Sequence, residues 1–527
     1  MEYKVLIASA GLGNRLKGIT KNINKALVSV DFKPAISHII EKFPVDIEFV
    51  IPVGYKKDLI IDFCNIAYPE RKFNFIDIDL FEGDGSGLGY SILKCKDHLQ
   101  CPFIFTSNDT IVLEKIPEPK KNWMGYSDVD EIVNYRSLEI RNDYVVNIHG
   151  KNAEIDAKAY IGLAGIRNFK EFWQEMEDGV NDGSLEIGES FGLRKLLEHD
   201  IHPLGFTWFD TGSIDKLKTT REFFANKRGK EHIVLEKEEE AIYFLNDKVI
   251  KFSTDNSFIM NRVARADKLA PFTPNILDKK RNFYSYDWVS GKVFSLNNDK
   301  KAFIDFLDWI KKLWTKVDLS NEESIAFNKI STAFYKEKTY KRVMDYFKVS
   351  ESYDSEETIN GIKYPKIGDI LDLIDWDKVM PDTCTRFHGD LHFENILYSV
   401  NENGYNFSLL DWRQDFGGNI NFGDIYYDLA KLNHGLIISH RNIDDNLYRV
   451  IKKNHDITFD FQMNYKNVEF QKYFFNWITK EGFDIHKVEL LTALIFLNIA
   501  CLHHNPYDHL LFYLGKSSLY KLIKGDL

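Results

Sequence analysis

Residues 5–15 read VLIASAGLGNR, an apolar run that leads directly into a glycine-rich turn. Short apolar runs of this kind alternate with helical stretches as far as Asp109, which predicts a parallel β-sheet with helices on both faces. The strands are expected at 47–53, 73–78 and 103–105, and the helices begin at Ala35, Lys56 and Leu88. In such sheets ligands bind at the carboxyl ends of the strands, where Gly11 and Asp109 both fall.

The glycine-rich turn is suited to binding phosphate. Gly11 and Gly13 let backbone N–H groups approach phosphate oxygens closely, and the cationic side chains of Arg15 and Lys25 can neutralise a triphosphate. A dinucleotide-binding turn is the alternative interpretation, but Leu16 stands where that motif has its third glycine.

Three further features point to the same chemistry. Asp109 follows a buried strand, where a carboxylate can hold Mg²⁺. Residues 83–87 form a second glycine loop, in which Gly85 is suited to contact a base or ribose. Asp210 ends a later strand and offers a second carboxylate.

This combination resembles the sugar-1-phosphate nucleotidylyltransferases, whose pattern is GxGxRL, a lysine soon after, a strand-end aspartate and a late W-x-D-x-G, here residues 208–212. The resemblance covers roughly residues 1–225, although the prolines usual around the lysine are absent. It implies a Rossmann-like α/β domain with a mixed, mostly parallel sheet. The implied roles are triphosphate binding and catalysis for Arg15 and Lys25, Mg²⁺ binding for Asp109 and Asp210, and sugar contact for Gly162.

A second motif lies far downstream, where His388-Gly389-Asp390 is followed by Asn395 and by a strand ending in Asp411. In phosphoryl transfer an aspartate orients the acceptor hydroxyl and takes its proton, and an asparagine on the same loop reaches a metal. A later strand-borne aspartate bridges Mg²⁺ to the phosphates. We therefore expect Asp390 to be catalytic and Asn395 and Asp411 to bind metal.

This motif resembles the aminoglycoside phosphotransferase and choline kinase families, which share the protein-kinase architecture. The similarity spans roughly residues 235–527 and implies a two-lobe α+β domain. It places Lys251 on the ATP-binding strand and Trp288 at the hinge that meets adenine, and it gives the acids of 423–430 a role in bracing the catalytic segment. The helix expected at 258–266 contains no glutamate that could pair with Lys251.

Length and composition limit the number of domains, the binding partners and the cellular compartment that are possible. A chain of 527 residues is too long for one core. A net charge of -11 argues against nucleic-acid binding, and five cysteines without metal-ligand spacing fit a reducing, cytoplasmic compartment. No export signal is recognised, and the longest apolar stretch, 490–502, is too short to span a membrane and is expected to be a core helix.

The charged composition around 222–240 marks a domain boundary. The expected organisation is a nucleotidyltransferase domain at 1–226, a linker at 227–240, a kinase N-lobe at 241–291 and a kinase C-lobe at 292–527.

The two motifs together predict a bifunctional enzyme with Mg²⁺ as its cofactor. The C-terminal domain would phosphorylate a small-molecule hydroxyl with ATP, and the N-terminal domain would couple the product to an NTP (CTP, UTP or GTP). A sugar anomeric hydroxyl would give an NDP-sugar for polysaccharide or cell-wall metabolism. One alternative is a choline or amino-alcohol kinase joined to a cytidylyltransferase, with Trp477, Phe474 and Phe475 as candidates for an aromatic cage or, equally, for core residues. Another is an inactive kinase-like binding module.

Overall fold

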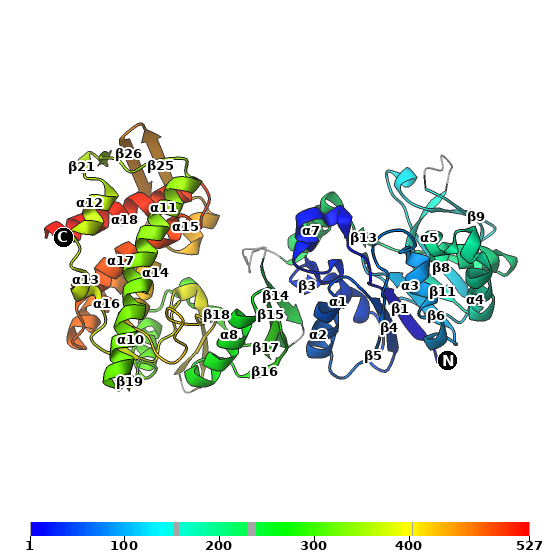
Figure 1. The fold of residues 1–527 in the computed structure, drawn as a ribbon, viewed down its shortest axis with the longest axis horizontal. Helices are drawn as coiled ribbons and strands as arrows, with labels where there is room; N and C mark the ends of the chain where they lie inside the picture. Colours follow the sequence, from blue (N-terminus) through cyan, green and yellow to red (C-terminus); the bar gives the residue numbers. More distant parts are fainter. Residues whose placement is uncertain (1, 152–156, 229–238, 246, 403, 526–527) are drawn as a thin grey trace. The chain divides into compact units, whose positions relative to one another are not determined.

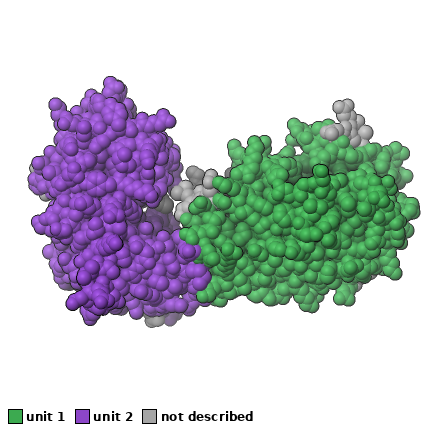
Figure 2. All heavy atoms as spheres, viewed as in Figure 1, with its two compact units in different colours: residues 1–256, 277–286 green, residues 257–276, 287–527 purple. Residues whose placement is uncertain are grey.

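The computed structural model describes residues 2–151, 157–228, 239–245, 247–402 and 404–525. The chain divides into two compact units (Figure 2), of which unit 1 comprises residues 1–256 and 277–286 and unit 2 comprises residues 257–276 and 287–527. Most of the linker expected at 227–240 lies outside the described residues.

A nine-stranded mixed sheet forms the centre of unit 1 (Figure 1). Its order is β10-β9-β11-β6-β1-β4-β5, and β8 joins β11 to β12. The neighbours β6, β1, β4 and β5 are parallel, whereas β9, β10 and β11 run antiparallel to their neighbours along this order. The strands are β1 Lys4–Ala8, β4 Glu48–Val53, β5 Lys72–Asp77, β6 Phe103–Ser107, β8 Asn122–Ser127, β9 Ser137–Arg141, β10 Tyr144–His149, β11 Lys158–Ile166 and β12 Ile201–Gly205. The expected α/β fold with a mixed sheet is confirmed.

Helices cover both faces of this sheet because successive side chains of a strand point to opposite faces. In β1, Val5 and Ile7 pack into a core with α1 and α2, while Leu6 packs into a second core with α3 and α4. These helices are α1 Ala35–Ile40, α2 Lys57–Ala67, α3 Leu88–Leu93 and α4 Phe169–Asp178. The first three begin within one residue of the expected positions.

A four-stranded sheet, in the order β14-β15-β17-β16, extends the first of these cores. Its strands are β14 Glu240–Leu245, β15 Lys248–Ser253, β16 Ile276–Lys279 and β17 Phe283–Asp287. Tyr243 and Phe283 are buried in the same core as Phe49 and Phe63, and the Tyr243 hydroxyl donates a hydrogen bond to the Leu27 carbonyl at 2.8 Å. Unit 1 therefore extends past the expected boundary near residue 226, because strands expected to open the next domain share its core.

Unit 2 is mostly helical, as expected for the chain after residue 292. Its principal helices are α8 Asn256–Leu269, α9 Lys300–Ile310, α10 Asn321–Thr332, α11 Lys338–Val349, α14 Ile425–Ile437, α16 Tyr465–Lys480, α17 Ile485–Ala500 and α18 Tyr507–Lys524. Among the described residues, three small sheets accompany them, in the orders β18-β23-β24, β21-β20-β26-β25 and β19-β22. Their strands are β18 Lys292–Val293, β19 Lys316–Val317, β20 Glu357–Ile359, β21 Ile362–Tyr364, β22 Cys384–Thr385, β23 Ile396–Asn401, β24 Gly404–Leu409, β25 Tyr448–Lys453 and β26 Asp456–Phe461. The apolar stretch at 490–502 forms most of the buried helix α17. Within the described ranges, no helix combines the length and apolar character that crossing a membrane requires.

Candidate active sites

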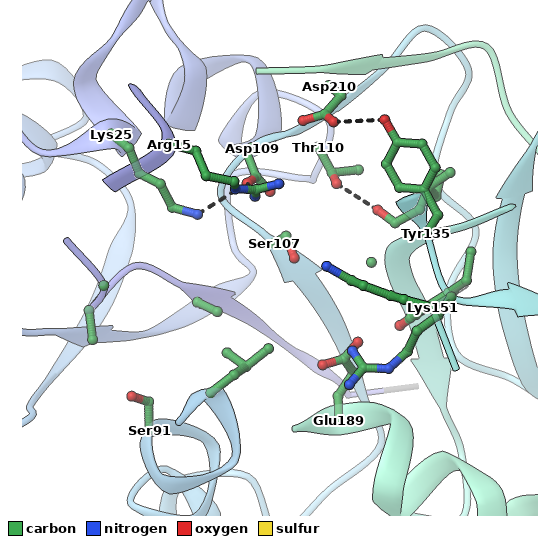
Figure 3. A pocket seen from close by; sticks show the side chains of 18 of the residues that line it. Arg15, Lys25, Ser91, Ser107, Asp109, Thr110, Tyr135, Lys151, Glu189 and Asp210 are labelled. Atoms are coloured by element: carbon green, nitrogen blue, oxygen red, sulfur yellow. Dashed lines mark hydrogen bonds and ion pairs between the residues drawn. The ribbon is translucent and has the colours of Figure 1, made fainter. Parts of the chain in front are cut away.

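A cavity of about 370 Å³ opens beside the ends of β1 and β6 in unit 1 (Figure 3). It has the size of a typical small-molecule site. Six of the residues expected from the sequence line it together: Gly11, Arg15, Lys25, Asp109, Gly162 and Asp210. Gly13 and Gly85 do not line the cavity, although each adopts a positive φ in a loop next to lining residues.

The loop that carries Lys25 is fixed by glycine and asparagine. Gly13 has a φ of 71°, and a Cβ at this position would lie 3.1 Å from the Lys25 Cβ, so a larger residue would push the lysine away. The Asn24 amide donates hydrogen bonds to the Ser9 and Tyr55 carbonyls at 3.3 and 2.8 Å, and its oxygen accepts one from the Ala26 N–H at 2.9 Å. Asn24 therefore holds a loop for which the resembling family uses prolines.

A short antiparallel pair brings the two carboxylates of the cavity together. Strands β7 Thr110–Val112 and β13 Trp208–Asp210 pair with Asp210 opposite Thr110. The Thr211 N–H also donates to the Asp109 carbonyl at 3.0 Å. A Cβ on Gly212 would lie 2.7 Å from Asp109 Oδ2 and 3.0 Å from Asp210 Oδ1, so both carboxylates converge on one point.

The environments of the two carboxylates differ. Lys25 Nζ lies 3.1 Å and Arg15 Nη2 3.7 Å from Asp109 Oδ2. Burial would raise the pKa of Asp109, but these two cations outweigh it and lower the pKa below its ordinary value. Burial and the charge of Asp109 raise the pKa of Asp210, although it accepts hydrogen bonds from Gly212 N–H and Tyr135 OH at 2.7 and 3.1 Å.

Two converging carboxylates fit a magnesium ion. Mg²⁺ is usually bound by one or two carboxylates together with substrate phosphates, and a like-charge pair held this close gains from a cation. Across the described ranges, no three His, Cys, Asp or Glu side chains are grouped to hold a metal by themselves. Asp109 and Asp210 would therefore hold the ion jointly with a bound nucleotide.

Several lining residues were not identified from the sequence. Lys151 adds a further cation to the cavity, on the side opposite Lys25 (Figure 3). Glu189 is only 3% exposed and lines the same cavity, and burial raises its pKa. Tyr135 binds Asp210 as described above. Lys151 and Tyr135 stand in irregular segments and Glu189 begins a short helix, so no local pattern marks them.

The second motif is assembled in unit 2 by a β-hairpin. Strands β23 Ile396–Asn401 and β24 Gly404–Leu409 pair with Ile396 opposite Leu409. Just beyond this pair, the Leu410 N–H donates to the Asn395 carbonyl at 2.8 Å, and the Arg413 N–H donates to the His388 carbonyl at 2.9 Å. The loop at 388–395 and the segment around Asp411 are thereby held side by side.

Asp390 lies at the centre of this loop and has partners on both carboxylate oxygens. Lys431 Nζ is 2.8 Å from Oδ1, whereas His392 Nε2 and Asn395 Nδ2 are 3.6 and 3.4 Å from Oδ2. Burial would raise the pKa of Asp390, but Lys431 and His392 hold it well below the ordinary value. Burial would lower the pKa of His392, but Asp390 and Glu394 raise it to about 9. His392 therefore contacts the candidate catalytic residue.

Asp428 braces the loop, as expected for an acid of the segment 423–430. Its carboxylate accepts hydrogen bonds from the backbone N–H groups of His388 and Gly389 at 2.7 and 2.6 Å, and from Trp314 Nε1 at 2.9 Å. Asp428 is fully buried, and burial raises its pKa to about 6. The brace fixes the backbone that positions Asp390.

Asp411 and Asn395 carry oxygen atoms of the kind that Mg²⁺ binds. Asp411 has a φ of 54°, a strained conformation of the kind found at functional sites. Arg262 of α8 places Nη1 3.3 Å from Asp411 Oδ1. The donor set suits Mg²⁺ shared with nucleotide phosphates, and the ion would compete with Arg262 for Asp411.

The two residues expected to bind ATP outside this cluster lie in different compact units. Lys251 is on β15 in unit 1, and Trp288 follows β17 in unit 2 with 41% of its surface exposed. The described part of α8 contains no glutamate, and instead Arg262 and Arg265 reach the segments around Asp411 and His388.

Each known protein described below matches less than half of the chain. No protein-family model matches it. The chain is 30% identical over 237 residues to the bifunctional protein GlmU of Methanococcus vannielii, covering 42% of this chain and 55% of that protein. It is 29% identical over 111 residues to the UTP–glucose-1-phosphate uridylyltransferase AglF of Haloferax volcanii, covering 20% and 44%. The chain thus spans about half the length of the curated relatives it matches, and these similarities support the sugar-1-phosphate nucleotidyltransferase family for the N-terminal part.

Two solved structures are similar at low identity. The CTP:phosphocholine cytidylyltransferase LicC of Streptococcus pneumoniae is 17% identical, with 43% of this chain and 100% of that chain covered and a TM-score of 0.35. The UDP-glucose pyrophosphorylase of Acinetobacter baumanii is 16% identical, with 44% and 95% covered and a TM-score of 0.36.

Proposed function

We propose that this protein makes a nucleotide-linked small molecule in two consecutive steps. Unit 2 phosphorylates a hydroxyl group with ATP, and unit 1 couples the resulting phosphate to an NTP with release of pyrophosphate. The observation that carries the proposal is the convergence of Asp109 and Asp210, with Arg15 and Lys25, on one cavity of nucleotide size.

The reaction in unit 1 needs no protein nucleophile. The phosphate oxygen of the acceptor attacks the α-phosphorus of the NTP in line, and the bond to pyrophosphate breaks. Lys25 and Arg15 stabilise the charge that develops on the phosphates, and Gly11 leaves room for their close approach. Mg²⁺ bound by Asp109 and Asp210 would offset the same negative charge on the phosphates.

A sugar 1-phosphate is the acceptor that we favour for unit 1. The uridylyltransferase AglF is named for glucose 1-phosphate, and the similarity to AglF supports an acceptor of this class. Glu189 lines the cavity and supplies a carboxylate that can accept hydrogen bonds from sugar hydroxyls.

The arrangement around Asp390 supports an active phosphotransferase rather than an inactive module. Asp390, ionised because Lys431 and His392 lower its pKa, can orient an acceptor hydroxyl and take its proton. Asn395 and Asp411 lie on adjoining segments, where they can share a metal with the phosphates of ATP. The amino-alcohol alternative has less support, because Phe474 and Trp477 are buried at 0% and 5% exposure.

The product itself tests the proposal. The purified protein is incubated with ATP, CTP, UTP and GTP and a panel of sugars and amino alcohols, and the products are identified by mass. We expect a nucleoside diphosphate linked to one acceptor, together with ADP and pyrophosphate. Pyrophosphate release that requires no phosphorylated acceptor, or a complete absence of linked product from every mixture, would rule the proposal out.

A further inference from the structure

Several cationic side chains lie beside the candidate site around Asp390 in unit 2. Lys431 contacts Asp390 directly at 2.8 Å. We call Lys431, Lys338, Arg413 and Arg342 together the basic cluster. Lys338, Arg413 and Arg342 are partly buried. Lys338 and Arg342 come from α11, and Arg413 follows the strand that ends near Asp411.

One aromatic ring organises this basic cluster. Lys338 Nζ lies 4.3 Å and Arg413 Cζ 5.1 Å from the centre of the Phe334 ring. The ring is itself fixed by stacking on Phe416 with 4.2 Å between centroids. Arg413 Nε is buried and has no hydrogen-bond partner. The ring therefore holds both cations in place without supplying a counter-ion.

The neighbouring carboxylates are already engaged elsewhere. Asp428 accepts backbone N–H groups, Asp424 accepts the Tyr335 hydroxyl at 2.7 Å, and Glu394 lies 2.9 Å from His392. Over the part of the chain that the structure describes, no carboxylate lies within 4.0 Å of the charged groups of Lys338, Arg342 or Arg413. Partly buried cations without a counter-ion are unfavourable, so an incoming anion would be stabilised there.

Burial and the neighbouring cations both lower the pKa of Lys338. Burial, followed by the charges of Arg413, Lys431 and Arg342, lowers the pKa of Lys338 to about 7, and Asp390 opposes this shift. An anion bound beside Lys338 would restore its full charge.

Lys431 links the basic cluster to the carboxylate oxygen of Asp390 that Asn395 does not approach. Asn395, the candidate metal ligand, approaches Asp390 Oδ2, whereas Lys431 binds Oδ1. Arg413, Lys431 and Asp390 all act on the pKa of Lys338, in keeping with a position beside Asp390. An acceptor whose hydroxyl lies at Asp390 would therefore bring any anionic group that it carries towards these cations.

The geometry points to an acceptor that already bears a carboxylate or phosphate group, held by Lys338, Arg413 and Arg342 while its hydroxyl lies at Asp390. This inference rests on the proposed kinase function of unit 2. In the step, the acceptor oxygen forms a bond to the γ-phosphorus of ATP and the bond from that phosphorus to the β,γ-bridging oxygen breaks. ADP leaves, and the hydroxyl proton passes to Asp390 and then to water. A sugar acid or a sugar phosphate satisfies these requirements, whereas choline would be repelled.

The test compares acceptors that differ in charge. ADP release from ATP is measured with glucose, glucuronate, glucose 6-phosphate and choline, and the two anionic sugars distinguish a carboxylate from a phosphate. We expect at least one anionic sugar to exceed glucose in kcat/KM by about 10-fold or more, as a charge-assisted hydrogen bond provides. A preference for glucose or choline would overturn the inference while leaving the kinase function intact.

Variants connect this preference to the basic cluster. Lys338→Met and Arg413→Met should each raise the acceptor KM about 10- to 100-fold with the KM for ATP unchanged. Lys338→Arg should retain the wild-type acceptor KM, and Lys348→Met, on the same helix but 74% exposed, is the matched control. A rise in the KM for ATP instead would assign the basic cluster to the donor and contradict the inference.

A binding measurement covers the case in which no acceptor of the panel is phosphorylated. Inorganic phosphate and glucuronate are titrated calorimetrically into the full-length wild type and into the Lys338→Met/Arg413→Met double variant. Binding by the wild type that the double variant loses would support the anion site even if the kinase proposal failed. Equal binding by both proteins, or none by either, would overturn it.

Discussion

At the scale of single residues, Asp109 and Asp210 occupy one site with opposite shifts in pKa. Asp109 is ionised by contact with Lys25 and Arg15, while Asp210 is partly buried beside that negative charge. The repulsion destabilises the metal-free protein and is the feature that a bound cation would relieve. Stability and activity should therefore respond in opposite directions to the same substitution.

Asp210→Asn should raise the thermal unfolding temperature of the metal-free protein at pH 7. The raised pKa of Asp210 means that its ionised form destabilises the folded state. Protonated Asp210 stabilises the folded protein, and this stabilisation is complete below 3.8, the pKa of Asp210 in the unfolded chain. It is lost as the pH rises through the higher pKa of Asp210 in the folded protein. The gain in unfolding temperature from Asp210→Asn should therefore vanish near pH 3. The same variant should lose about 100-fold or more in pyrophosphate release.

The control for this substitution is Asp128→Asn, because the Asp128 side chain is 80% exposed and forms a surface ion pair with Lys158. It should change neither property. An Asp210→Asn protein that unfolds at a lower temperature at pH 7 would contradict the account of the carboxylate pair.

His392 makes unit 2 less stable as the pH becomes alkaline. Its pKa is raised from 6.5 to about 9 in the folded protein. The stabilisation is therefore complete below pH 6.5 and is lost as pH rises towards 9. The urea midpoint of the wild type should fall over this window more steeply than that of His392→Gln. His455→Gln, at an exposed position of unit 2, should follow the wild type, and parallel profiles for all three proteins would contradict the assigned pKa.

At the scale of elements, the sequence predicts those features that the residue types and spacing within a single segment encode. Spacing and residue type alone identify three features: the glycine turn at 11–15, the strand ends that carry Asp109 and Asp210, and the loop at 388–395. The pairing of β7 with β13 could not be predicted, because its register depends on segments almost a hundred residues apart in the chain. The basic cluster was missed for a similar reason, since Lys338 and Lys431 look like ordinary helix-surface lysines in the sequence.

The domain boundary shows the same limit. The charged segment at 222–240 indicates a linker, but the buried side chains of β14, β15 and β17 pack into the core of α1 and α2. Alternating apolar residues identify these as strands without indicating which core they complete.

Tyr243→Ala should therefore impair unit 1, although Tyr243 lies beyond the boundary expected from composition. Its ring is completely buried against Phe63, with 5.4 Å between centroids, and removal of such a side chain costs about 3 kcal/mol or more. Pyrophosphate release should be lost at a lower temperature on heating. Tyr465→Ala, at a side chain that is 73% exposed, should leave the inactivation curve unchanged. Identical curves for Tyr243→Ala and the wild type would contradict a shared core.

At the scale of the whole molecule, the two sets of catalytic and metal-binding candidates belong to separate compact units. All of Arg15, Lys25, Asp109 and Asp210 belong to unit 1, and all of Asp390, Asn395, Asp411 and Lys431 belong to unit 2. The two chemistries can therefore be lost independently. If the acceptor of unit 2 is anionic, unit 1 would receive a phosphorylated product that carries a second negative group, for which Lys151 provides a cation within its cavity.

The central claim is that two carboxylate sets serve consecutive steps on one metabolite, and paired substitutions test it most directly. ADP release with acceptor and pyrophosphate release with phosphorylated acceptor are measured for Asp109→Asn and for Asp390→Asn, after circular dichroism shows that both are folded. Asp390→Asn should lose ADP release by about 100-fold or more and retain pyrophosphate release, and Asp109→Asn should do the reverse. If either substitution in a folded protein removed both activities, or neither, the division of labour between the two units would be contradicted.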